Sequence, residues 1–75
     1  MPRHPRPIKP HPIIEVLIYK REAMGWTRQD VANSMECSYD AVYGWETGII
    51  HPTFARLLEW CELFGLKLMV AEKRK

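Results

Sequence analysis

The chain has little cysteine and no spacing of residues that suits a metal ion. Its 75 residues include two cysteines, Cys37 and Cys61, and three histidines scattered among prolines and loop residues. Two cysteines without a secretion signal are more typical of free thiols than of a disulfide. A zinc site needs paired Cys or His ligands at short spacings. The sequence therefore predicts no disulfide scaffold, no metal site and no cofactor.

Long apolar runs are also lacking. None approaches the ~20 residues that a membrane-spanning helix needs, and no apolar segment near the start precedes a small-residue cleavage site. At 8.9 kDa the chain has room for one small domain. No nucleophile, base and orienting group cluster in the sequence as catalysis would require. We expect a cytoplasmic protein that is neither an enzyme nor a membrane protein.

Acidic residues are absent from both ends of the chain. Residues 1–12 carry Arg3, Arg6 and Lys9, and residues 73–75 are all basic, whereas residues 13–72 hold five basic and nine acidic residues, a net charge of −4. Five of the six prolines also lie in residues 2–12, where they fix φ and remove amide donors. The pattern predicts a disordered basic arm at 1–12, a folded domain at 13–72 and a basic tail at 73–75.

The folded part shows four helical patterns. Apolar residues recur at helical spacing from Ile13 to just before Gly25, and a second helix is expected over 27–35, with Thr27 as its cap and Asp30 completing a capping box. Ser38 caps a third helix over 38–47. A fourth follows Thr53 and closes at Gly65, and Trp26, Trp45 and Trp60 are expected in the core.

The segment from Leu66 to Val70 alternates enough to suggest a short β-strand. A lone strand is not stable, and the rest of the chain is helical. The expected partner is the same strand of a second copy, which gives a two-fold homodimer.

Two short capped helices joined by a tight turn, from Gly25 to Gly48, have the spacing of a helix-turn-helix. A helical bundle with no nucleic-acid role would show the same periodicity, so the residue identities decide. The chain resembles the lambda-repressor-like family, the Cro and phage-repressor type of helix-turn-helix, over about residues 13–70. The residues that carry the resemblance are Arg21, Gly25-Trp26-Thr27, Val31-Ala32, Ser38, Val42, Trp45-Glu46, Gly48, Pro52 and Gly65-Leu66.

The resemblance implies an all-α, compact four-helix domain in a sequence-specific DNA-binding transcriptional regulator, a repressor acting as a homodimer. It also implies roles for individual residues. The base-reading positions are Ser38, Tyr39, Asp40, Tyr43 and Gly44, the phosphate-contacting positions are Thr27, Arg28, Thr47 and His51, and Arg21 and Glu46 form a structural ion pair.

Three features depart from the family's usual pattern. Glu36 stands where the turn usually has glycine, so a non-glycine residue is expected in the left-handed region. Gly44 lies inside the third helix, which the resemblance makes the recognition helix, where it either admits DNA closely or marks a helix end. The outer face lacks the Arg, Gln or Asn side chains that commonly bind guanine or adenine, but Asp40 can accept from cytosine N4, and Tyr39 and Tyr43 can contact a phosphate or a thymine methyl. The target sequence stays open.

Several alternatives remain at this stage. Arg28 is either a phosphate ligand or a solvated cation, and the two tyrosines either read bases or cover the core edge. The arm with Arg3, Arg6 and Lys9 either follows the DNA backbone or enters the minor groove through Arg3 or Arg6, or it stays solvated. The alternative function is that of an antitoxin-like module that binds a partner protein and also regulates its own operon.

Overall fold

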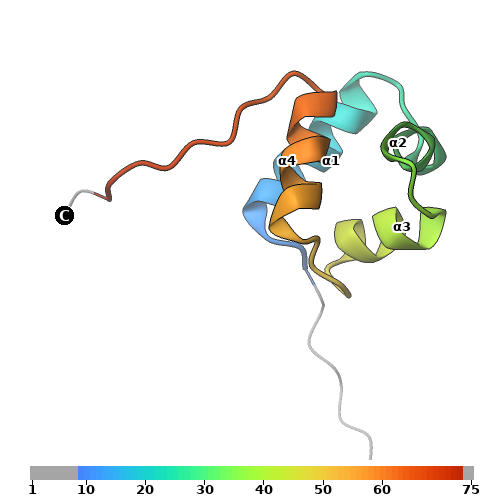
Figure 1. Cartoon of the computed structure of the whole chain (residues 1–75), viewed down its shortest axis with the longest axis horizontal. Helices are drawn as coiled ribbons and strands as arrows, with labels where there is room; N and C mark the ends of the chain where they lie inside the picture. Colours follow the sequence, from blue (N-terminus) through green and yellow to red (C-terminus); the bar gives the residue numbers. More distant parts are fainter. Residues whose placement is uncertain (1–8, 74–75) are drawn as a thin grey trace, which may run out of the picture.

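The computed structural model describes residues 9–73. It contains four helices in the order α1 (Pro12–Ala23), α2 (Arg28–Met35), α3 (Tyr39–Thr47) and α4 (Phe54–Leu63) (Figure 1). The four-helix, all-α domain expected from the sequence is confirmed. Helix α1 begins inside the predicted arm, because His11 is its N-cap and Pro12 occupies its first turn. No helix in residues 9–73 is long and apolar enough to cross a membrane.

Side-chain caps set the starts of the two helices of the motif. At α2, the Asp30 amide donates to Thr27 Oγ1 (3.0 Å) and the Thr27 amide donates to Asp30 Oδ2 (2.8 Å), so the predicted capping box is present. At α3, the Ala41 amide donates to Ser38 Oγ (3.1 Å). These bonds satisfy amides that a helix start leaves without an intrahelical partner. They fix where α2 and α3 begin.

The turn between α2 and α3 depends on one strained residue. Glu36 has φ 55° and ψ 48°, in the left-handed region, as the sequence predicts. The Cys37 amide donates to the Ala32 carbonyl (3.0 Å) and the Glu36 amide to the Asn33 carbonyl (3.3 Å), which ends α2 in a Schellman-type turn. A left-handed residue with a Cβ costs roughly 1–2 kcal/mol. The turn that contains this strained residue sets the direction of α3 relative to α2.

Aromatic rings fill the core between the helices. Trp60 of α4 is completely buried and meets Trp45 of α3 with ring centroids 5.5 Å apart. Trp26 is half-buried and packs edge-on against Phe64 at 5.7 Å. Within the described chain Trp60 Nε1 has no hydrogen-bond partner. Helix α2 packs against both α3 and α4, so packing in the core fixes the positions of the two motif helices.

The predicted β-strand from Leu66 to Val70 is wrong. Residues 66–73 form neither helix nor strand, and they leave the bundle as an extended chain (Figure 1). A strand needs a neighbouring strand for its hydrogen bonds, and no strand forms anywhere in residues 9–73. Leu66 and Leu68 pack against the core edge, whereas Met69 and Val70 are 76% and 97% exposed.

Candidate nucleic-acid interface

Helix α3 has one buried side and one exposed side. Val42, Trp45 and Glu46 face the bundle, and Val42 and Glu46 are at most 4% exposed. Four of the five predicted base-reading residues, Ser38, Tyr39, Asp40 and Tyr43, are exposed. The structure thus brings these four together on the outer side of α3, which we call the α3 outer face.

The two tyrosines of the α3 outer face form a stacked pair. Their ring centroids are 6.2 Å apart and their planes differ by 21°, and each residue is 42% exposed. The guanidinium of Arg28, from the first turn of α2, lies over the Tyr43 ring with its Cζ 5.1 Å from the centroid. A cation over the face of an aromatic ring is attracted by the ring's quadrupole. The start of α2 therefore contacts the outer face of α3 directly.

Beneath the tyrosines lies a buried carboxylate shared by two arginines. Arg21 donates from Nε to Glu46 Oε2 (2.8 Å) and from Nη2 to Oε1 (2.9 Å), and its Nη1 donates to the Trp26 carbonyl (2.8 Å). Arg28 Nε adds a third bond to Glu46 Oε1 (2.9 Å). The Glu46 side chain is fully buried, whereas that of Arg28 is 32% exposed. The structure brings Arg21 and Glu46 together and adds Arg28 to them.

The environment of Arg28 favours its charged form. The pKa of its guanidinium lies above the ordinary value, chiefly because of the hydrogen bond to Glu46 and secondly because of the nearby Tyr39 side chain, while partial burial acts in the opposite sense. Neither alternative for Arg28 from the sequence, a phosphate ligand or a solvated cation, included this ion pair. Eighteen residues separate Arg28 from Glu46, so no local spacing rule signals it.

Gly44 lies apart from the other predicted base-reading residues because it is buried. A Cβ built at this position would lie 3.0 Å from Ile50 Cδ1, and the Ile50 amide donates to the Gly44 carbonyl (3.1 Å). Helix α3 continues to Thr47, so Gly44 does not mark its end. The missing side chain lets the loop after α3 fold back onto the helix.

Some of the predicted phosphate-contacting residues already make hydrogen bonds within the protein, whereas others are exposed. The Thr47 hydroxyl donates to the Tyr43 carbonyl (2.8 Å) within α3, and the Thr27 amide is held by the capping box. His51 is exposed in the loop that follows α3. In the arm, Lys9 is exposed, while Arg3 and Arg6 lie outside the described residues.

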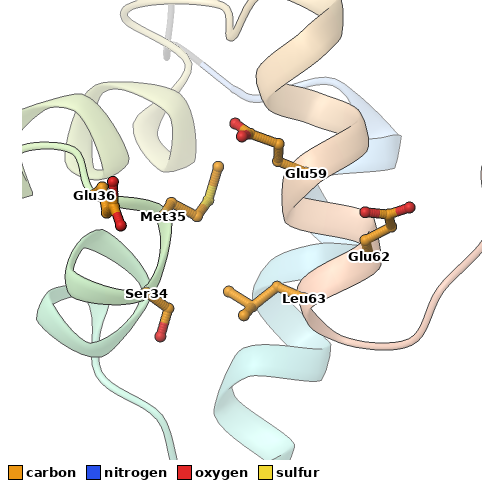
Figure 2. A pocket seen from close by; sticks show the side chains of 6 residues that line it. All are labelled: Ser34, Met35, Glu36, Glu59, Glu62 and Leu63. Atoms are coloured by element: carbon orange, nitrogen blue, oxygen red, sulfur yellow. The ribbon is translucent and has the colours of Figure 1, made fainter.

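One hollow lies away from the α3 outer face, between the end of α2 and α4 (Figure 2). It measures about 450 Å³ and is lined by Ser34, Met35, Glu36, Glu59, Glu62 and Leu63. Three of these six side chains are carboxylates, which repel a phosphate backbone. Electrostatics therefore disfavour this side of the bundle as a DNA contact.

Comparison with known proteins agrees with this geometry. A family model described as helix-turn-helix, of the lambda-repressor-like type that includes Cro, matches residues 17–69. The chain belongs to this helix-turn-helix family. The match spans the part of the chain from α1 to the segment after α4, and the family is one of DNA-binding regulators of transcription that are generally not enzymes. No curated protein and no solved structure matches the chain significantly.

Proposed function

We propose that the protein is a sequence-specific DNA-binding repressor that places α3 in the major groove. The observation that carries this proposal is the α3 outer face: exposed polar and aromatic side chains on a helix whose opposite side is fixed in the core. Within this face, Asp40 suits the amino group of cytosine, and the tyrosine rings suit thymine methyl groups. Ser38 suits either a base edge or a phosphate.

The charge of the domain makes the basic arm part of this proposal. The arginines of the bundle already bind carboxylates, since Arg21 and Arg28 share Glu46 and Arg56 pairs with Glu59 at 3.0 Å. Phosphate neutralisation supplies much of protein–DNA affinity. We therefore assign Arg3, Arg6 and Lys9 to the DNA backbone or minor groove, together with His51 beside α3.

The repressor would act as a homodimer, with two α3 helices in successive major grooves about 34 Å apart. The segment after α4 supports this arrangement, because Met69 and Val70 are exposed apolar residues, and Leu66 and Leu68, just before them in the chain, line a hollow of about 180 Å³ together with Val16. A second copy would cover this apolar surface. Sedimentation should show a dimer that Met69→Ser with Val70→Ser dissociates, and a monomer at every concentration would contradict it.

Selection of bound sequences from random duplex DNA tests the proposed function. The expected result is enrichment of a two-fold motif whose half-sites lie one helical turn apart. The variant with both Tyr39→Ala and Tyr43→Ala should stay folded but enrich no motif. Equal recovery of all sequences by the unmodified protein would contradict sequence-specific binding.

The second candidate, an antitoxin-like module, is favoured by the same exposed apolar segment, which could dock a partner protein. Copurification of the unmodified chain with a stoichiometric protein, with no measurable DNA affinity, would support this candidate. DNA selection that yields a motif without any such partner would exclude it as the main role.

A further inference from the structure

The sequence does not predict the contacts of Arg28. This residue connects the buried Glu46 with the α3 outer face. Its Nε is bonded to the buried carboxylate of Glu46, and its guanidinium lies over Tyr43, which in turn stacks on Tyr39.

Glu46 is a firm anchor for Arg28. Its carboxylate has no exposed surface and is held on its other side by two hydrogen bonds from Arg21. The single charge-assisted bond from Arg28 Nε to this carboxylate, 2.9 Å long, restrains the guanidinium. Arg28 is therefore a fixed cation at the edge of the interface.

The tyrosine pair needs such a fixed neighbour. Both rings are 42% exposed on a helix surface, and exposed side chains change rotamer on the picosecond to nanosecond timescale. A planar cation over Tyr43 favours the one rotamer that keeps the ring beneath it, and the stacking at 6.2 Å passes this preference on to Tyr39.

We propose that Arg28 is a positioning residue for base recognition, which holds the Tyr39 and Tyr43 rings in the orientation that meets the base edges of the major groove. This inference rests on the proposed DNA-binding function. It differs from a phosphate contact by Arg28, which would strengthen binding to every sequence equally.

The variant Arg28→Lys separates the two roles because it keeps the positive charge and removes the planar fork. Positioning predicts that the variant loses discrimination at the base pairs read by the tyrosines. There, the penalty for a mismatch, ordinarily about 5- to 150-fold, should fall by about threefold or more. The salt dependence of binding should stay unchanged. A phosphate contact predicts an unchanged base preference, and that result would overturn the proposal.

Two controls complete the test. Arg56→Lys is the matched variant, because Arg56 also binds a carboxylate, that of Glu59, but lies on α4; its base preference should equal that of the unmodified protein. In a background with both Tyr39→Leu and Tyr43→Leu, Arg28→Lys should not change the base preference that remains, as expected for a residue that acts through these two rings. A full additional effect in that background would contradict the proposal.

A measurement without DNA keeps the inference separate from the proposed function. The NMR signals of the Tyr39 and Tyr43 rings should move toward free-tyrosine values in Arg28→Lys, while the signals of the Trp45 and Trp60 rings in the core stay in place. Unmoved tyrosine signals would overturn the positioning role even if the protein binds DNA. If the unmodified protein selects no sequence but the tyrosine signals move, the proposed function fails and the contact stands.

Discussion

The two sides of α3 make opposite uses of their residues. The buried side contributes Val42, Trp45 and Glu46 to the interior, where the carboxylate is fully buried and bonded to two arginines. The exposed side carries Tyr39, Asp40 and Tyr43. A helix can present a variable surface to a ligand only if its other side is held firmly. The difference predicts that changes on the buried side alter stability and changes on the exposed side alter binding.

The largest effect should come from Glu46→Ala. Removing one partner of a buried ion pair leaves the other charge uncompensated, at a cost of about 3–5 kcal/mol. Here the buried Arg21 would lose the carboxylate that accepts two of its bonds. Urea denaturation measures the change in the free energy of unfolding. The control, Glu59→Ala, breaks a pair with a half-exposed carboxylate and should cost less than about 1 kcal/mol. Equal costs for both variants would refute the anchoring role.

Tyr39→Ala should weaken DNA binding and leave the stability of the fold almost unchanged. We expect DNA affinity for the selected site to fall by about 1–3 kcal/mol, the usual value of a base contact, and unfolding to change by less than about 1 kcal/mol. Fluorescence anisotropy with the selected duplex measures the affinity. Tyr19→Ala is the control, because Tyr19 is an exposed tyrosine on α1, and it should bind as the unmodified protein does. A large loss of stability with intact affinity would reverse the comparison.

The arm should contribute through salt-dependent affinity. Replacing Arg3 and Arg6 with alanine should reduce the salt slope of binding by about 1.8 if both contact phosphates, since each contact contributes about 0.9. Such a variant leaves the His11 cap of α1 intact, unlike removal of residues 1–12. Binding curves at several salt concentrations provide the slope. Identical curves for variant and unmodified protein would show that Arg3 and Arg6 do not contact DNA phosphates.

The smallest effect is expected at the turn that joins α2 to α3. Glu36→Gly should stabilise the fold by about 1 kcal/mol, because glycine adopts the left-handed φ of 55° without the strain of a Cβ. Gly25→Ala, at φ 74°, is the matched reverse change and should destabilise by a similar amount. Thermal unfolding measures both. A destabilised Glu36→Gly variant would mean that the Glu36 side chain itself supports the turn.

Local rules predict much of this fold because its signals are local. The capping box of Thr27 and Asp30 lies within one turn, and the resemblance to a family whose turn usually has glycine at this position predicts a left-handed Glu36. The strand after α4 was a wrong prediction for the opposite reason. An alternating pattern records only which residues are apolar, and whether Leu66 to Val70 form a strand depends on a partner that the pattern does not specify.

Spacing predicts where the candidate site lies on α3, but it does not predict the contacts that its residues make. Spacing along α3 places Tyr39 and Tyr43 on one surface, one turn apart. The link from Arg28 to Glu46 joins two helices across eighteen positions, and Gly44 is covered by Ile50 from the next loop. Both features follow from the angle between packed elements, which helical periodicity does not encode.

The most direct test of the α3 outer face as the DNA-binding surface is an NMR titration of the unmodified chain with its selected duplex. Amide signals of residues 27–28, 38–43 and 47–51 should shift, and those of residues 58–63 on α4, beside the acidic hollow, should not. Shifts confined to α4 and the segment after it, with α3 unchanged, would contradict the proposed role of α3.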